Sequence, residues 1–209
     1  MDKLICLVGE SGSGKSTMAT LLEKEGYNYI RSYTTRKPRH EGERGHIFVD
    51  IVPSITVDNG KEGFEGALDE ENIIAYTFFD KAHYWSTKEQ YQGKGTSIYI
   101  IDPTGVKYLK EKVKDAEIMV IYLKADERKR KARIINRGCE KIKFVPSSRN
   151  QQKRMRMQIK TTTQQEVYRR IKYDRDVFKI IKCDYVIDAN RSIEEVLEDI
   201  KRIIRREDL

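Results

Sequence analysis

The sequence predicts an α/β fold with a central parallel sheet, on the strength of three observations. Short apolar segments that suit buried strands alternate along the chain with stretches of helical periodicity. The first strand, at 4–8, is followed by a glycine-rich loop and by a helix at 16–25 that Gly26 ends. The later strands each lead into a helix and are expected at 96–101, 117–123 and 184–188.

Length and composition bound the kind of protein. A chain of 209 residues favours one folding unit with a substantial core over two independent domains. Its apolar runs are too short to span a bilayer, and its amino terminus shows no signal-peptide pattern. Its three cysteines are odd in number and widely spaced, which indicates neither a disulfide framework nor a zinc site. We therefore expect a reduced, cytoplasmic protein with no membrane contact.

The glycine-rich loop after the first strand fulfils the pattern G-x-x-x-x-G-K-[ST] over residues 9–16. Its glycines allow backbone N–H groups to point inward at the oxygens of a triphosphate. We expect Lys15 to reach the β- and γ-phosphates, and the Ser16 hydroxyl to complete the coordination of Mg²⁺. The loop therefore predicts ATP and Mg²⁺ binding in a P-loop NTPase fold, with an ordinary Gly/Ser-rich turn as the alternative. The residues expected to bind ATP here are Gly9, Gly12, Ser13, Gly14, Lys15, Ser16 and Thr17.

A basic segment follows a short strand expected at 27–31. Arg36 and Arg39 are spaced to converge on a dianionic monophosphate, because each offers a planar fork of donors. Ser32 and Thr34 add hydroxyl groups at close range. A basic surface loop is the alternative.

This segment resembles the substrate-phosphate motif of the guanylate kinase family, S-x-T-T-R-x-P-R followed by G-E and an aromatic segment. The resemblance implies that Ser32, Arg36 and Arg39 hold the phosphate of an acceptor nucleoside monophosphate. The family has a tyrosine where this chain has His46, which can still donate a hydrogen bond to a phosphate oxygen. A structural or solvated histidine is the alternative.

Residues 50–71 are rich in glycine and acids and predict loops with a short helix at about 64–72, before a strand at 73–79. The guanylate kinase family carries a glutamate before this strand that binds the guanine base, and Ala75 takes its place here. Since an alanine cannot accept these hydrogen bonds, guanine selectivity must come from another acid or be absent. The candidate acids are Asp69, Glu70, Glu71 and Asp80.

The stretch 83–87 resembles the family's Y-G-[ST]-T turn. The resemblance implies that Tyr84 contacts the monophosphate and that Ser86 contacts the base. Trp85 replaces a glycine of the family pattern. We expect it either to wall the pocket by stacking or to fill the core.

The strand at 96–101 ends in Asp102 and leads into a helix at 106–114. A carboxylate at the carboxyl end of a parallel strand lies beside the phosphate loop, where it can orient Mg²⁺ or the acceptor. The stretch resembles the family's D-I-D-x-x-G, which supports this role for Asp102, although the first aspartate is Ile100 here. A helix N-cap is the alternative role of Asp102.

A further helix is expected at 126–137, closed by Gly138. Arg130, Arg133 and Arg137 recur at intervals of three and four residues and therefore share one face. The resemblance to the family's R-L-x-x-R-G implies that Arg137 lies by the ATP base and that Arg133 approaches the phosphates. A solvated helix face is the alternative.

The net charge of +8 is concentrated in residues 128–175, which hold seventeen Lys and Arg against three acids. We expect a basic lid at 138–168 that closes over the phosphates of a nucleotide, and a helix at 165–181 after it. Arg170 resembles the family's lid-return arginine, which implies that it neutralises charge on the transferred γ-phosphoryl group. A nucleic-acid surface and a solvated face are the alternatives, and the phosphate loop makes nucleic acid the less favoured partner.

The whole pattern predicts one kinase domain with three parts. They are a core at 1–30, 92–137 and 169–209, a monophosphate-binding part at 31–91 and a lid at 138–168. A capping box at Ser192 opens the last helix, which runs to about 206.

The expected reaction is transfer of the ATP γ-phosphoryl group to a nucleoside monophosphate, with GMP or dGMP as the first candidates. The expected catalytic residues are Lys15, Arg36, Asp102 and Arg170. The rival hypotheses are a kinase for another nucleoside monophosphate, a non-catalytic guanylate-kinase-like interaction domain, and a nucleic-acid-binding ATPase or polynucleotide kinase.

Overall fold

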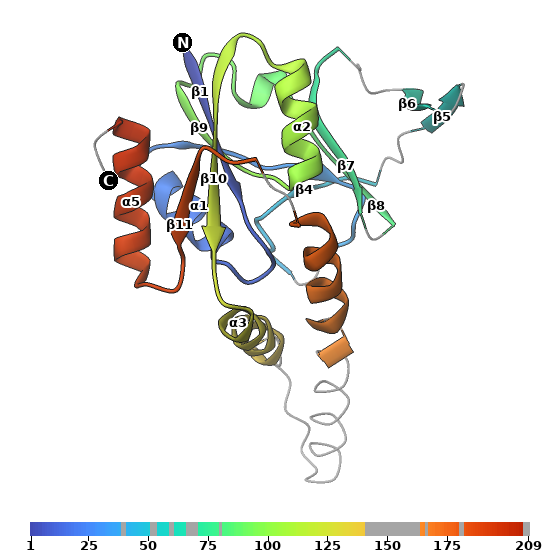
Figure 1. The fold of residues 1–209 in the computed structure, drawn as a ribbon. Coiled ribbons are helices and arrows are strands. Elements are labelled where there is room, and N and C mark those ends of the chain that lie inside the picture. Colours follow the sequence, from blue (N-terminus) through green and yellow to red (C-terminus); the bar gives the residue numbers. More distant parts are fainter. Residues whose placement is uncertain are drawn as a thin grey trace. The chain divides into compact units, whose positions relative to one another are not determined.

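The computed structural model of the chain, drawn in Figure 1, describes residues 1–38, 41–50, 54–58, 61–65, 71–79, 81–140, 164–165, 167–179 and 182–206. The chain forms two compact units. The first unit contains Met1–Val8 and Ser16–Ile121, and the second contains Gly9–Lys15 and Tyr122–Leu209. Each unit has its own set of buried apolar residues.

The core of the first unit is a parallel sheet. Strand β1 (Asp2–Val8) pairs in parallel with β9 (Thr96–Ile100), which pairs in parallel with β2 (Asn28–Ile30). Strand β10 (Ala116–Lys124) neighbours β1 on its other side. Residues 4–8 of β1 are fully buried, as expected of a strand that is covered on both faces. The predicted α/β class with a parallel sheet is confirmed.

Two described helices of the first unit follow strands of this sheet along the chain. Helix α1 (Lys15–Lys24) follows the glycine-rich loop as predicted, and Gly26, with a φ of 97°, lies in the turn that ends it. Helix α2 (Pro103–Lys112) packs against β7 (Ile73–Phe79), as can be followed in Figure 1. It begins three residues earlier than expected, because Asp102 caps it.

A second sheet of the first unit contains four strands. In order they are β4 (Ile47–Phe48), β3 (Tyr33–Thr34), β8 (Ala82–Thr87) and β7, and the short helix η1 (Lys88–Gln90) follows β8. The turn predicted over 83–87 is wrong, because these residues pair with β3 on one side and with β7 on the other. Trp85 stacks on Tyr33 with ring centroids 5.6 Å apart and is 3% exposed, so it fills the core.

Strands β5 (Ser54–Asp58) and β6 (Lys61–Glu65) form an antiparallel hairpin with Ile55 opposite Phe64. The short helix predicted at about 64–72 is therefore wrong where the structure describes it. The β-branched residues of β5 favour the extended backbone that such a hairpin needs. Three of the candidate guanine-binding acids, Asp69, Glu70 and Asp80, lie outside the described residues.

In the described residues of the second unit, three helices and a strand follow β10. They are α3 (Glu127–Glu140), a helix at 167–177, β11 (Tyr185–Asp188) and α5 (Ile193–Arg205). Helix α5 packs against β11, drawn beside it in Figure 1, and the predicted capping box at Ser192 is confirmed. Ile134 of α3 is buried together with Val167 and Ile171 of the helix at 167–177, so these two helices share a core.

Two helix ends differ from expectation in this unit. Helix α3 runs through Gly138, which keeps a helical backbone, because a glycine costs a helix only about 1 kcal/mol unless it turns to positive φ. The helix at 167–177 ends before 181, in a turn at 178–179. Residues 141–163 lie outside the described residues, so the lid at 138–168 and the three-part division stay predictions. Among the helices described, none is long and apolar enough to cross a membrane.

Candidate active site

The phosphate loop belongs to the second unit, and glycine is required at two of its positions. A Cβ on Gly9 would lie 2.6 Å from the carbonyl oxygen of Leu123, and one on Gly12 would lie 2.7 Å from that of Arg130. Gly12 also has a φ of 84°, which other residues rarely adopt. A Cβ on Gly14 would meet no described atom within 4 Å. The loop therefore packs against the end of β10 and against α3, and is open at Gly14.

Lys15 closes the loop on itself. Its Nζ donates hydrogen bonds to the carbonyl oxygens of Gly9 and Glu10, the second at 3.1 Å. The next residues along α1, Ser16 and Thr17, are exposed at the first turn of the helix, where N–H groups favour anions. The Ser16 hydroxyl is thus accessible to a ligand, whereas the neighbouring Ser13 is 2% exposed and buried in the loop.

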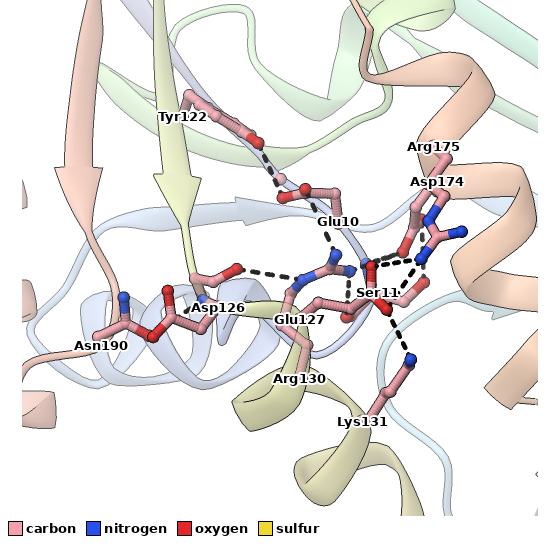
Figure 2. Close-up of polar contacts among 12 residues, drawn as sticks. Glu10, Ser11, Tyr122, Asp126, Glu127, Arg130, Lys131, Asp174, Arg175 and Asn190 are labelled. Carbon is pink, nitrogen blue, oxygen red and sulfur yellow. Dashed lines mark hydrogen bonds and ion pairs between the residues drawn. The ribbon is translucent and has the colours of Figure 1, made fainter.

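Arg130 of α3 is the charged group that fastens this loop, as Figure 2 shows. Its side chain is buried, and its Nη1 donates to the Ser11 carbonyl oxygen at 3.3 Å and to the Asp174 carboxylate at 3.0 Å. Its Nε donates to the Ala125 carbonyl oxygen at 3.2 Å, and its Nη2 lies 3.5 Å from the Glu10 carboxylate. Every nitrogen of the Arg130 guanidinium group therefore contacts an oxygen atom of the protein.

Asp174 binds the loop directly from the helix at 167–177. One carboxylate oxygen accepts the Ser11 N–H at 2.9 Å, and the other accepts the Ser11 hydroxyl at 3.3 Å. Burial raises the pKa of the Asp174 carboxyl, while the Ser11 N–H and the charges of Lys15 and Arg130 act against this rise. The carboxylate is thus buried but surrounded by donors and cations.

Tyr122, near the end of β10, binds the side chain of the loop residue Glu10. Its hydroxyl donates to the Glu10 carboxylate at 2.8 Å, and burial, followed by the Glu10 hydrogen bond and charge, raises the pKa of Tyr122. We call Glu10, Tyr122, Arg130 and Asp174 the loop clamp. Sequence reasoning missed it, because 112 residues separate Tyr122 from Glu10. The one available signal was that Asp174 is among only three acids in the basic stretch 128–175.

The other predicted ATP residues of the second unit lie on two helices. Arg133 donates to the Gly12 carbonyl oxygen at 3.2 Å and to the Ala189 carbonyl oxygen at 3.1 Å, so it is close to the loop but binds its backbone. Arg170 lies half-buried on the helix at 167–177. Arg137 lies in α3, and its side chain is outside the described part of the chain. Contacts of these arginines with ATP stay predictions.

Arg36 is the centre of a second charged group, in the first unit. Its Nη2 and Nη1 donate to the two Glu43 carboxylate oxygens at 2.8 and 3.2 Å, and its guanidinium carbon lies 5.2 Å from the centre of the Phe48 ring. Tyr84 accepts a side-chain hydrogen bond from Arg36, and the His46 ring packs edge-on against Tyr84 with centroids 5.5 Å apart. These five residues are the Arg36 cluster, which brings together three of the predicted monophosphate-binding residues.

The charge of the Arg36 cluster is set by the Arg36–Glu43 pair. Burial lowers the pKa of the Arg36 guanidinium, but the hydrogen bond and charge of Glu43 outweigh this and raise the pKa overall. Glu43 therefore uses the fork of donors that was predicted to bind a phosphate. Arg39, the other arginine of the predicted phosphate grip, lies outside the described residues.

Ser32 and Ser86 lie in a different, buried cluster with Tyr99 of β9. The Ser86 hydroxyl donates to the Tyr99 hydroxyl at 2.7 Å, and the Ser32 hydroxyl lies 3.3 Å from the same oxygen. Burial raises the pKa of Tyr99 to about 12. Ala75 faces Ser86 in the β7–β8 register and is 2% exposed. The predicted base contact, Ser86, is thus engaged by Tyr99, a partner that the sequence did not reveal.

Asp102 performs the role that was the alternative in the sequence. Its Oδ1 accepts the Gly105 N–H at 2.7 Å as the cap of α2 and the Thr77 hydroxyl at 3.3 Å. Burial raises the pKa of Asp102, and the Gly105 N–H opposes the rise. Among the described residues no three His, Cys, Asp or Glu side chains gather as a metal site. Mg²⁺ held by phosphate oxygens, water and the Ser16 hydroxyl would not need one.

Comparison with known proteins assigns the chain to a family. A family model described as an AAA domain matches residues 5–156. The chain belongs to the AAA domain family. The chain is also 25% identical over 204 residues to the dephospho-CoA kinase of Corynebacterium glutamicum. This alignment covers 96% of the chain and 97% of that kinase.

A solved structure of another protein has a similar fold. The crystal structure of guanylate kinase from Anaplasma phagocytophilum matches 98% of this chain and 85% of that one, with a TM-score of 0.50 and 15% sequence identity. This likeness concerns the fold, and it confirms the predicted α/β P-loop fold and its similarity to the fold of guanylate kinase.

Proposed function

We propose that this AAA domain protein transfers the γ-phosphoryl group of ATP to a nucleoside monophosphate. The observation that carries the proposal is the presence of two cationic groups suited to phosphate, the phosphate loop with Lys15 and the fork of Arg36 beside Tyr84. A protein that binds a single nucleotide needs only the first. A second phosphate site is what an enzyme needs when it joins two phosphate-bearing substrates.

The chemistry requires positioning and charge neutralisation rather than a covalent intermediate. In this proposal Lys15, which the carbonyl oxygens of Gly9 and Glu10 hold in place, binds the β- and γ-phosphate oxygens with its third donor. Arg36 aligns the acceptor phosphate, and Arg170 neutralises the transferred group. The accessible Ser16 hydroxyl is the side chain that would hold Mg²⁺, and the bound ion would supply further neutralisation of the phosphates. Asp102 orients the acceptor or the waters of the metal.

GMP and dGMP are the acceptors that we propose first, from the motif at 32–39. Ala75 offers no hydrogen-bond acceptor to a base, and the Ser86 hydroxyl is engaged by Tyr99. Neutral hydrogen bonds discriminate among bases less strongly than a buried carboxylate does, so we expect a modest preference. Dephospho-CoA is the second candidate acceptor, because the similarity to a dephospho-CoA kinase spans 96% of this chain.

An assay of ADP formation tests the proposal with GMP, dGMP, AMP, UMP, CMP, dTMP and dephospho-CoA as acceptors, and mass spectrometry identifies the products. We expect GMP or dGMP to have the highest kcat/KM, by less than about a hundredfold over the next monophosphate. Turnover of dephospho-CoA alone would replace the monophosphate as the substrate.

Two further outcomes separate the rival hypotheses. ATP binding without turnover of any acceptor would contradict the kinase proposal and favour an interaction domain. Phosphorylation of an oligonucleotide 5′-hydroxyl, with binding that weakens steeply as salt increases, would favour a polynucleotide kinase.

A further inference from the structure

Asp174 is a buried acid on an otherwise solvated stretch of helix. The residue is 3% exposed, whereas the next two residues, Arg175 and Asp176, are exposed. An ionised carboxylate is costly to bury unless donors and cations surround it. Asp174 binds Ser11, which belongs to the phosphate loop, and Arg130, which itself donates to the carbonyl oxygen of Ser11. The position of Asp174 is therefore explained by the loop and not by its own helix.

The hydrogen bonds of Asp174 and Arg130 fix the backbone of Ser11 from both sides. Asp174 accepts the Ser11 N–H, which belongs to the peptide unit between Glu10 and Ser11, and Arg130 donates to the Ser11 carbonyl oxygen in the next peptide unit. Because peptide units are planar, holding two successive units sets the two dihedral angles between them. The loop thus has one defined conformation at its third residue.

The first of these peptide units, between Glu10 and Ser11, is also hydrogen-bonded to Lys15. Its N–H is bound by Asp174 at 2.9 Å, and its carbonyl oxygen, that of Glu10, accepts Lys15 Nζ at 3.1 Å. Rotation of this unit would move the carbonyl oxygen away from the ammonium group. Asp174 therefore sets the place of Lys15 through one rigid peptide.

The same carboxylate holds the helix that carries Arg170. Arg170 and Asp174 are four residues apart and lie on one face of that helix. On a neighbouring face, Val167 and Ile171 are buried together with Ile134 of α3. The bond from Asp174 to Ser11 consequently links the helix of Arg170 to the loop of Lys15.

We propose that Asp174 is a positioning residue for donor-phosphate binding, acting through Ser11 and Arg130 to place Lys15 and to hold the helix of Arg170 against the loop. This inference rests on the proposed function, in that ATP is taken as the donor. Asp174 does not itself contact the nucleotide. Its effect is therefore on the affinity for ATP, and the affinity for the acceptor is unchanged.

The test compares Asp174→Asn with the matched control Asp176→Asn, an acid on the same helix whose described ion pair is with exposed Lys179. The measurements are the ATP Kd by calorimetry, the thermal melting temperature, and the KM of ATP and of the acceptor. Asp174→Asn is expected to weaken ATP binding about tenfold, the loss of one hydrogen bond to a charged group, with the acceptor KM within about twofold. The control leaves all values within about twofold.

An ATP Kd within twofold of the unaltered protein overturns the inference, even if the melting temperature falls, because Asp174 would then be structural only. If Asp174→Asn does not fold, amide exchange in the unaltered chain decides instead. Saturating ATP is expected to slow exchange both in the loop and in the helix at 167–177, and slowing confined to the loop overturns the inference. ATP binding without any acceptor turnover would remove the kinase proposal and leave this inference to be judged on Kd alone.

Discussion

The loop clamp and the Arg36 cluster each hold an arginine, buried in the clamp and half-buried in the cluster, but they hold it by different means. Arg130 binds two backbone carbonyl groups and Asp174, and Asp174 is 163 residues away from Ser11, the loop residue that it binds. Arg36 binds chiefly Glu43, a carboxylate only seven residues away in the same segment. The clamp therefore builds a fixed backbone cradle, whereas the Arg36 cluster presents a side-chain fork whose partner a phosphate can replace. If the proposed function holds, we therefore expect the donor site to be preformed and the acceptor phosphate to displace Glu43 from Arg36.

The largest effect is expected at the preformed cradle. Replacing Lys15 by methionine removes the only side-chain cation of the loop itself and is expected to lower kcat by about a thousandfold, as for other groups that stabilise a charged transition state. The control is Lys24→Met, an exposed lysine at the end of the same helix, which should leave kcat unchanged. Steady-state ADP formation measures both. A Lys15→Met protein with near-normal kcat would contradict the assignment of the loop as the donor site.

A second change tests the exchangeable fork. Arg36→Lys keeps the charge but loses the planar pair of donors, so the acceptor KM is expected to rise about a hundredfold while the KM of ATP stays constant. Arg44→Lys, at an exposed position of the same segment, serves as the control. If the KM of ATP rose instead, Arg36 would belong to the donor site and the contrast between the two regions would fail.

A smaller effect is expected at Glu43. If this carboxylate competes with the acceptor phosphate for Arg36, then Glu43→Gln lowers the acceptor KM by about threefold, because the pair itself contributes less than about 1 kcal/mol in a partly solvated site. Acceptor titrations at saturating ATP measure the change. A rise in the acceptor KM would show that Glu43 orients the fork rather than competing for it.

The smallest effect on activity is expected at Tyr99, whose hydroxyl contacts Ser32 and Ser86, two of the predicted acceptor-binding residues. Tyr99→Phe removes the hydroxyl that Ser86 and Ser32 share and is expected to cost about 1 kcal/mol of unfolding free energy in urea, with kcat unchanged. Unchanged stability together with an altered acceptor preference would instead place this hydroxyl in base recognition.

The pH dependence of stability gives Tyr99 a second signature. Because the folded-state pKa of Tyr99 is raised from 10.0 to about 12, its contribution is complete below pH 10 and is lost as the pH rises through 12. The stability difference between the unaltered protein and Tyr99→Phe should therefore shrink across this range. Urea unfolding at several alkaline pH values measures it.

The comparison also explains which parts of the site the sequence revealed. The phosphate loop is contiguous, and its glycines and Lys15 have spacing dictated by one local geometry, so the motif predicted it. Arg36 was predicted from its spacing to Arg39 and from a resemblance, and His46 and Tyr84 from the resemblance; the structure places these three residues in one cluster. Asp174 carries no local pattern, because its partner Ser11 is 163 residues away.

The fold divides in the same way. Strands buried on both faces, such as 4–8, and the capping box at Ser192 were predicted because burial and capping leave marks within a few residues. The stretch 83–87 was taken for a turn, since its partners in β3 and β7 cannot be read from the stretch itself. Burial and capping patterns within a few residues thus predicted where helices and strands lie. The pairing of strands that are distant in the sequence could be seen only in the structure.

The bond between Ser11 and Asp174 has a consequence for synthesis of the chain. The loop leaves the ribosome early, but the carboxylate that orders it is made 163 residues later, which at typical translation speeds is roughly ten to thirty seconds. During that interval the nascent chain contains the complete nucleotide motif without the residue that orders it. A truncated chain that ends before residue 174 is therefore expected to bind ATP weakly although every residue of the motif is present.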